Sequence, residues 1–278
     1  MSLKLMYITN NPNVALIAEK NGVDRVWVDL ETFGKEERQK HMNTVKSKHS
    51  VADIRRIAPL LTTAEMLVRV NSWNDNSVQE IKAVIDAGAD IIMLPMWKSA
   101  SEVTNFINAI EGKCKTILLL ETKEAVECLD EVLKIDGIDE IHIGLNDLHL
   151  SYKMTFMFEL LSNGTVEKIC EKIKAAGIPY GFGGVSSLGT GEIPAEKIIM
   201  EHYRIGSTMA ILSRSFCDTE LISDLGVVDK IFSKYLFELR RYEETLISTT
   251  EERFMENKKD VLKCVEKIVK TKKRERDV

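Results

Sequence analysis

The sequence predicts an α/β fold of the (β/α)8 (TIM) barrel class with a C-terminal helical extension. Eight short apolar runs alternate with segments of helical periodicity. The runs are continuously apolar, as expected for parallel strands buried on both faces. A doubly wound open sheet is the alternative, but eight repeats and the absence of a GxGxxG motif after the first run disfavour it.

The barrel core is expected to span residues 1–217. Its strands are predicted at 3–9, 25–31, 65–71, 90–96, 115–121, 140–147, 179–185 and 206–213. Helices are predicted at 13–22, 51–61, 77–88, 99–112, 122–135, 165–177 and 194–203. Gly88 provides a stop signal, and either Ser99 or Ser101 is a suitable helix N-cap, with Glu102 three residues after Ser99.

Residues 218–278 form the predicted extension. An amphipathic helix is expected over 218–247, and a second, charge-rich helix over 249–278. The second helix carries only a narrow apolar stripe, which needs a surface to cover it. That surface is either the chain's own barrel or a neighbouring subunit in a homo-oligomer.

Composition excludes several classes of partner. The 278 residues are 44% hydrophobic and 29% charged, and the net charge of −5 argues against nucleic acid as the main partner. No apolar run approaches the roughly 20 residues that cross a bilayer, so no membrane association is expected. Five dispersed cysteines without a CxxC pair, in a sequence with no apparent signal peptide, suggest reduced thiols and a cytoplasmic location.

Polar residues cluster where the predicted strands end. In a (β/α)8 barrel these carboxyl ends converge on one mouth, which holds the active site. The residues at these ends are Asp29 and Glu31 in the second strand, Arg69 and Asn71 in the third, Glu121 in the fifth, Asn146 and Asp147 in the sixth, and Gly181, Gly183 and Gly184 in the seventh.

Glu121 and Asp147 are the sharpest pair among them. They lie one strand–helix–strand repeat apart, so we expect them at equal height on adjacent strands. Two neighbouring carboxylates repel unless a cation holds them. A hard ion such as Mg²⁺ or Mn²⁺ does so and keeps positions open for substrate. The alternative is a pair of rim acids bonded to backbone amides or lysines.

Arg69 lies in an otherwise apolar strand and therefore needs a partner. It suits a substrate carboxylate or an enolate oxygen, and an ion pair with Glu31 or Glu121 is the structural alternative. Gly183 and Gly184 let a ligand approach the backbone or simply form a turn. The loop 187–192 is a lid or an ordinary surface loop.

The five histidines differ in their expected roles. His142 alternates with isoleucines and is expected to be a satisfied wall residue. His149 is expected to contact ligand or orient its loop. His41 and His49, after the second strand, are general-base candidates or plain surface residues. His202 lies before the eighth strand, away from the mouth.

Five segments resemble one known family. "VDLE", "LVRVN", "GADIIMLPM", "LLLETKEAV" and "IGLNDL" occur in the order and spacing of the HpcH/HpaI aldolase/citrate lyase family, over roughly residues 5–215. The resemblance implies a (β/α)8 barrel that uses Mg²⁺ or Mn²⁺ to cleave or form a C–C bond beside a pyruvate-like or acyl-CoA enolate. Such proteins commonly oligomerise, often with the last barrel helix packed on a neighbour.

The resemblance also implies roles for individual residues. Glu121 and Asp147 would ligate the metal, and Arg69 would bind the carboxylate and stabilise the enolate. Asp29 and Glu31 would shape the site. One position departs from the pattern: Thr32 stands where the pyruvate-aldolase branch has a histidine base and the citrate-lyase-like branch usually has an acid.

A threonine hydroxyl cannot act as a general base near pH 7, so the usual proton acceptor is missing. Three functions remain as hypotheses. The first is a divalent-metal-dependent lyase acting on a 2-oxo acid or hydroxy acid, with metal-held water, His41, His49 or His149 replacing the base. Asn71, Asn146, Gly183 and Gly184 would help to bind the substrate. The second is an acyl-CoA lyase of the citramalyl or malyl type, for which the basic candidates near the mouth are Lys98 and Lys153. The third is a barrel that binds metal and oxo acid without turnover.

Overall fold

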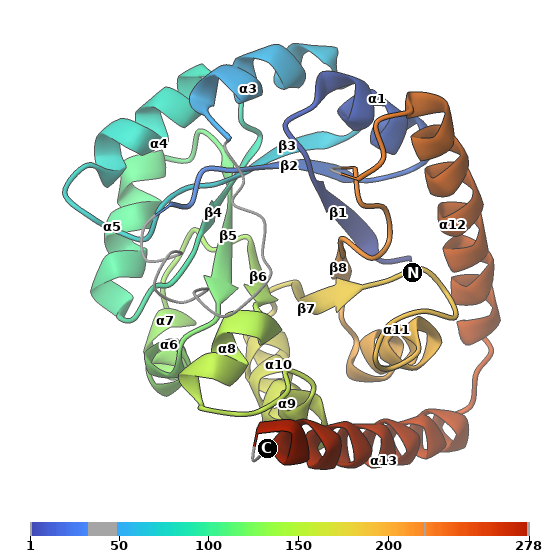
Figure 1. Ribbon diagram of the computed structural model, residues 1–278. Coiled ribbons are helices and arrows are strands. Elements are labelled where there is room, and N and C mark those ends of the chain that lie inside the picture. Colours follow the sequence, from blue (N-terminus) through green and yellow to red (C-terminus); the bar gives the residue numbers. More distant parts are fainter. Residues whose placement is uncertain (1, 33–48, 220, 277–278) are drawn as a thin grey trace.

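A computed structural model describes residues 2–32, 49–219 and 221–276 and confirms the barrel (Figure 1). Eight parallel strands pair in sequence order, and the eighth closes on the first. They are β1 Lys4–Ile8, β2 Arg25–Asp29, β3 Glu65–Arg69, β4 Ile91–Leu94, β5 Lys115–Leu120, β6 Glu140–Ile143, β7 Tyr180–Val185 and β8 Met209–Leu212.

Helices surround this barrel. They are α1 Pro12–Lys20, α3 Val51–Ile57, α4 Ser77–Asp86, α5 Ala100–Ile110, α6 Lys123–Glu127, α7 Leu129–Val132, α8 Leu145–Ser151, α9 Glu159–Ser162, α10 Thr165–Ala175, α11 Ala195–Ile205, α12 Leu225–Leu246 and α13 Glu251–Arg276, with a 3₁₀ turn, η1, at Ala58–Leu60. None of these helices is long and apolar enough to span a bilayer.

Three expected elements are wrong in detail. The helix expected over 218–247 begins only at Leu225, as α12, because the Asp224 side chain accepts the Gly226 and Val227 N–H groups and caps it there. The helix expected over 122–135 is split into α6 and α7 around Cys128. The sixth strand ends at Ile143 rather than at 147, because Gly144 begins a helical turn: its carbonyl accepts the Leu148 N–H at 3.0 Å. Helices α8 and α9 therefore occupy part of the segment that we expected to be a loop.

Alternate strand residues fill the barrel. The inner apolar side chains are Met6, Trp27, Leu67, Ile91, Met93, Ile117, Leu119 and Met209. At the amino-terminal end of the strands, the fully buried Arg25 donates to both Glu140 carboxylate oxygens at 2.6 and 2.8 Å and to Glu65 at 3.0 Å. These three residues, which we call the base cluster, close the end opposite the mouth.

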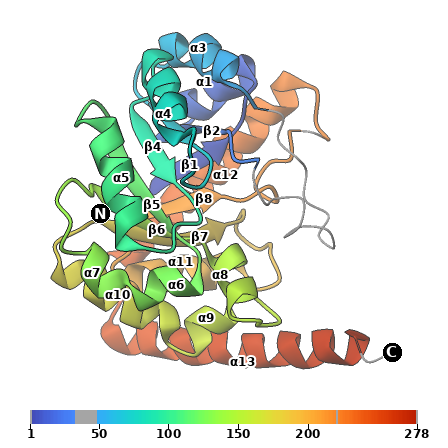
Figure 2. The same cartoon turned by 90° about the vertical axis from the view of Figure 1, so that its left-hand side faces the viewer.

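The C-terminal helices pack on their own chain. Helix α12 lies against α1 and α11, and α13 crosses α11 and α9 (Figures 1 and 2). Val261 and Val265 of α13 are buried, and Asn257 donates to the Lys197 carbonyl at 2.9 Å. The chain's own helices α9 and α11 therefore cover Val261 and Val265 of the apolar stripe, in agreement with the first alternative, whereas Leu262 stays exposed.

Candidate active site

A buried cluster of opposite charges lies at the ends of β2 and β3. The Arg69 guanidinium binds Asp29 through two hydrogen bonds, Nε to Oδ1 at 2.9 Å and Nη2 to Oδ2 at 2.8 Å. The same Nη2 is 3.2 Å from Glu31 Oε2. Both acids are 3% exposed, and the guanidinium also lies 5.2 Å above the centre of the Trp27 ring. The predicted ion pair with Glu31 is confirmed, and Asp29 is the closer partner.

The charges of this cluster compensate one another. Burial alone would lower the pKa of Arg69, but the carboxylates of Asp29, Glu31 and Glu121 together raise it above its usual value. Arg69 therefore stays cationic at any physiological pH. Its interaction with Glu121 also places the β3 arginine in the electrostatic reach of the β5 carboxylate.

Thr32 and Asn71 join the segments that follow these strands. The Thr32 N–H and hydroxyl both donate to Asn71 Oδ1, at 2.8 and 3.2 Å. The Asn71 amide donates to Glu80 Oε1 at 2.7 Å, and burial raises the pKa of Glu80. Thr32 thus serves as a hydrogen-bond donor at the position where the family pattern has a base.

His49 lies beside the end of β2. Its Nδ1 accepts the backbone N–H of Asp29 at 2.9 Å, and the ring is half-buried. Because Nδ1 accepts, the neutral ring carries its proton on Nε2. The structure therefore brings His49 to the candidate site, whereas His41 lies outside the described residues.

Glu121 follows β5 and is 3% exposed. Its Oε1 accepts the N–H of Met96, at 3.1 Å, and Met96 adopts a left-handed backbone with φ of +54°. A Cβ on Gly144 would lie only 2.8 Å from Glu121 Oε2, so glycine is needed there to leave room for the carboxylate. Neither Gly144 nor the Met96 N–H was singled out from the sequence.

We expected Asp147 and Asn146 at the end of the sixth strand. They lie instead in the first turn of α8. Asp147 is half-buried there and Asn146 is exposed. An acid is favoured in the first turn of a helix, because it faces the positive end of the helix dipole. Glu121 and Asp147 still belong to neighbouring strand–loop units at the same end of the barrel.

The residues fit a hard divalent cation as a partial ligand set. Glu121 and Asp147 supply carboxylate oxygens, which Mg²⁺ and Mn²⁺ prefer, and Mg²⁺ in particular keeps several water or substrate ligands. Within the described ranges, no group of three or more His, Cys, Asp or Glu side chains is arranged to hold a metal.

Strand β7 bends at the mouth. Its register on β8 shifts between Gly181 and Gly184, and Gly183 has φ of +51°. His142, fully buried inside the barrel, donates from Nε2 to the Gly183 carbonyl at 3.0 Å. Burial lowers the pKa of His142 to about 4, so the ring is neutral. His142 thus supports the bend, a role beyond that of a wall residue.

The other two described histidines make local contacts in and beside their own helices. His149 Nδ1 donates to the Leu145 carbonyl at 3.2 Å within α8, which favours the loop-orienting alternative. His202 is buried on α11, stacks on Phe182 at 3.9 Å and bonds Ser207 at 2.8 Å. It packs on the outside of the barrel, away from the mouth, as predicted.

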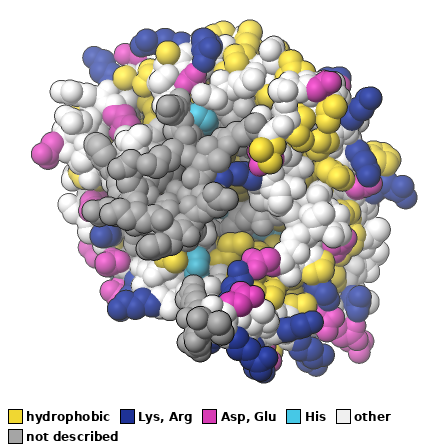
Figure 3. All heavy atoms as spheres, viewed as in Figure 1, with side chains coloured by type: hydrophobic (Ala, Val, Ile, Leu, Met, Phe, Trp, Pro, Cys, Tyr) yellow, Lys and Arg dark blue, Asp and Glu magenta, His cyan; other side chains and the backbone are white. Residues whose placement is uncertain are grey.

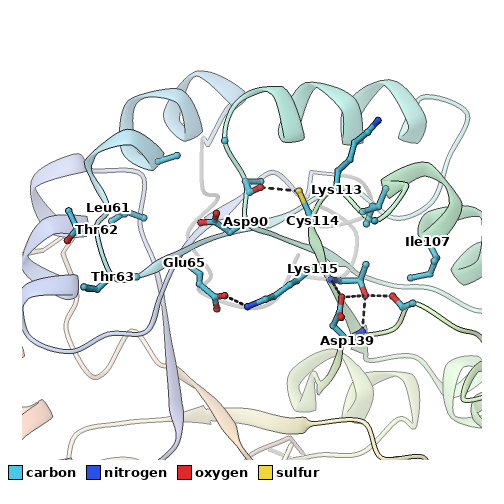
Figure 4. A pocket seen from close by; sticks show the side chains of 18 residues that line it. Leu61, Thr62, Thr63, Glu65, Asp90, Ile107, Lys113, Cys114, Lys115 and Asp139 are labelled. Atoms are coloured by element: carbon cyan, nitrogen blue, oxygen red, sulfur yellow. Dashed lines mark hydrogen bonds and ion pairs between the residues drawn. The ribbon is translucent and has the colours of Figure 1, made fainter.

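A cavity of about 860 Å³ lies at the opposite end of the barrel, around the starts of β3 to β5 (Figure 4). Its charged groups are engaged with protein atoms: Lys115 pairs with Glu65, Asp90 accepts the Met66 N–H at 2.7 Å, and Asp139 accepts the Thr116 N–H at 2.8 Å. Residues at this end of a (β/α)8 barrel generally serve stability, so it is not our candidate site.

The sequence pattern of the HpcH/HpaI aldolase/citrate lyase family matches residues 4–198, well over half of the chain. The chain belongs to this family. Among curated relatives of the family, it is 28% identical to the hydroxypyruvate/pyruvate aldolase of Rhizorhabdus wittichii over 38% of this chain and 54% of that protein. It is 26% identical to the 4-hydroxy-2-oxo-heptane-1,7-dioate aldolase of Salmonella heidelberg over 28% of this chain and 40% of that protein.

These alignments span about half or less of the curated relatives. Solved structures show the same fold over a longer stretch. The HpcH/HpaI aldolase from Desulfitobacterium hafniense superposes with a TM-score of 0.62 at 14% identity, covering 82% of this chain and 93% of that one. The citrate synthase SbnG superposes with a TM-score of 0.58 at 19% identity, covering 82% and 94%.

Proposed function

We propose that this chain is a divalent-metal-dependent carbon–carbon lyase that cleaves a 2-oxo acid bearing a hydroxyl two carbons from the carbonyl. The observation that carries the proposal is the buried Asp29–Arg69–Glu31 cluster in the electrostatic reach of Glu121 at the barrel mouth. Family membership and the names of the aldolase relatives support the same reaction class.

Arg69 is suited to hold a substrate oxygen. Its Nε and Nη2 serve Asp29 and Glu31, and among the described residues we find no partner for Nη1. Two N–H groups therefore remain for a carboxylate or for the charge that develops on an enolate oxygen. Because the two acids already fix the guanidinium plane, little reorganisation is needed when that charge forms.

The metal, bound by Glu121 and Asp147, would polarise the substrate carbonyl as a Lewis acid. The Met96 N–H positions the Glu121 carboxylate for this role, and the missing Cβ of Gly144 leaves room for it. Gly183 and Gly184 of β7, with Asn146 after the neighbouring strand β6, would contribute backbone and amide contacts to the substrate. Asn71 would act by holding Thr32 and the end of β3 in place.

The proton on the substrate hydroxyl needs an acceptor. Thr32 donates its hydroxyl proton to Asn71, so it does not supply one. His49 is our candidate. While its Nδ1 accepts the Asp29 N–H, the neutral ring carries a proton on Nε2 and offers the substrate a donor. To accept a proton, His49 must therefore release the Asp29 N–H. The same arrangement favours a second function, in which the barrel binds metal and 2-oxo acid without turnover. The acyl-CoA lyase alternative rests on the family resemblance alone.

Calorimetric titration tests the shared part of these functions. Mn²⁺ should bind the wild-type chain, and oxalate, a pyruvate-enolate mimic, should bind only after Mn²⁺. Glu121→Gln should weaken Mn²⁺ binding at least about ten-fold, as loss of a metal ligand does. Glu124→Gln, an exposed acid three residues later, is the matched control and should bind normally.

Turnover then separates the two functions. Pyruvate released from a 4-hydroxy-2-oxo acid is measured with a coupled lactate dehydrogenase assay. Release that depends on Mn²⁺ and is lost in Arg69→Met supports the lyase. Binding without release, in wild type and in Thr32→His, supports the binding protein. Absence of Mn²⁺-dependent oxalate binding in the wild type refutes both.

A further inference from the structure

A second pocket adjoins the candidate site on the β7–β8 side of the mouth. It measures about 310 Å³ and is bounded by Gly184, Ser186, Ser213, Phe158, Ile193 and Ile198. We call it the rim pocket. Gly184 belongs both to this pocket and to the bent segment of β7 at the mouth, so the pocket lies beside the candidate substrate-binding glycines.

The serine hydroxyls of the rim pocket are already bonded within the protein. Ser186 donates its hydroxyl to the Thr190 carbonyl at 3.1 Å, and the Ser213 and Ser215 hydroxyls bond each other at 2.7 Å. The Ala195 N–H, at the start of α11, also donates to Thr190, at 3.1 Å. The pocket therefore offers a ligand mainly apolar surface, from Phe158, Ile193, Ile198 and their neighbours.

The only charged side chain among those that the described chain contributes to the pocket wall is Glu192. Glu192 pairs with Lys272 of α13, Oε1 to Nζ, at 2.7 Å. Charged side chains gather along the lower edge of the mouth face, where α13 lies (Figure 3). Arg214, between Ser213 and Ser215, is exposed and does not line the pocket. A ligand in the rim pocket is therefore near the Glu192 carboxylate and near no cationic side chain of the described pocket lining.

We propose that the rim pocket receives the distal fragment of the substrate and selects an uncharged chain over one that ends in a carboxylate. This inference rests on the proposed lyase function. At about 30 Å³ per water-sized atom, 310 Å³ holds roughly ten non-hydrogen atoms, enough for an aldehyde fragment of four to six carbons. The relative from Salmonella heidelberg is named for a dioate, whose second carboxylate the rim pocket would disfavour.

Aldol addition measures this selectivity directly. Wild-type protein with Mn²⁺ and pyruvate is offered pentanal or succinic semialdehyde, two acceptors of similar length of which only the second is charged. We expect a higher kcat/KM for pentanal. Glu192→Gln removes the acid and leaves Lys272 uncompensated, so the preference should shift towards succinic semialdehyde by about three- to ten-fold, the effect of one partly screened charge at this range.

Two further variants sharpen the test. Met157→Arg places a cation on the half-buried rim and should shift the preference in the same direction as Glu192→Gln. Glu111→Gln removes an exposed, ion-paired acid at the other end of the barrel and should change nothing. Folding of each variant is checked by circular dichroism, and the preference is a ratio, so it does not depend on the active fraction.

The outcomes separate the two proposals. If the wild type turns over neither acceptor, the lyase function fails, and the rim-pocket proposal fails with it. If the wild type is active but prefers succinic semialdehyde, or if Glu192→Gln and Met157→Arg leave the ratio within two-fold of wild type, the rim-pocket proposal alone is refuted.

Discussion

The base cluster makes a strong prediction about stability. Arg25 is fully buried, and its guanidinium carries two hydrogen bonds to Glu140 and one to Glu65. Removing one partner of a buried ion pair generally costs about 3–5 kcal/mol, because the other charge stays in the interior. Lys4 Nζ also lies 3.2 Å from Glu140 Oε1, and this second cation is retained in Arg25→Met. We therefore expect a loss in the lower half of that range, about 3–4 kcal/mol.

That loss is large against a typical total stability of about 5–15 kcal/mol. Urea unfolding followed by circular dichroism at pH 7 measures it as a shift of the midpoint at constant m-value. A second replacement provides the control. Arg25→Met with Glu140→Leu removes both charges and should recover most of the lost free energy of unfolding, since no buried charge is left alone.

Acid should narrow the difference in the free energy of unfolding between wild type and Arg25→Met. Burial alone would raise the pKa of Glu140, but Arg25 and Lys4 lower it below its ordinary value. A carboxyl group with a lowered pKa stabilises the fold above its unfolded pKa, about 4.3, and this contribution is lost as pH falls through the folded value. The gap between the two proteins should therefore narrow below about pH 4.5. A pH-independent gap, or a loss under about 1 kcal/mol at pH 7, would refute the reasoning.

Three further predictions concern Gly144 and the buried histidines. Gly144→Ala should weaken Mn²⁺ binding about ten-fold or more, because its Cβ would lie 2.8 Å from Glu121 Oε2; titration of Gly226→Ala, which should bind normally, is the control. His142→Phe removes the donor to the Gly183 carbonyl and should raise KM for the 2-oxo acid several-fold, with a smaller change in kcat. His142→Gln keeps a donor near the position of Nε2 and should restore KM. Equal KM values in the two variants would argue against this positioning role. Burial lowers the pKa of His142 to about 4 and that of His202 to about 3, against about 6.5 unfolded, so the free energy of unfolding should fall as pH drops from about 6.5 to 4, with a shallower slope in His142→Gln; equal slopes in a urea series would contradict it.

The barrel was predictable because its signal is repeated and local. Strands buried on both faces read as apolar runs, and each run is followed by helical periodicity, so eight repeats reinforce one another. The error at the sixth strand has a local cause. Residues 144–147 follow the apolar run without a break in the sequence pattern, and the bond from the Leu148 N–H to the Gly144 carbonyl, which ends the strand, leaves no mark in that pattern.

The candidate site was predictable as a set of strand ends but not as a set of contacts. The partner of Arg69 is mainly Asp29, which shares its β-sheet register, and this pairing follows only once β2 and β3 are aligned. The base cluster was missed altogether, because Arg25 and Glu140 are 115 residues apart and meet only across the closed barrel. The role of His142 was hidden by a bend in β7 that sequence periodicity does not report.

The salt bridge between Glu192 and Lys272 also has a consequence for the order of biosynthesis. Translation at about 5–20 residues per second delivers Lys272 several seconds after Glu192. During that interval the eight strands can close while the loop that carries Glu192 still lacks its fastening on α13. On the ribosome, the wall of the rim pocket that contains Glu192 would thus be completed after the barrel has closed. A nascent chain stalled before residue 272 has emerged should already resist proteolysis in its strands while remaining cleavable within residues 187–192.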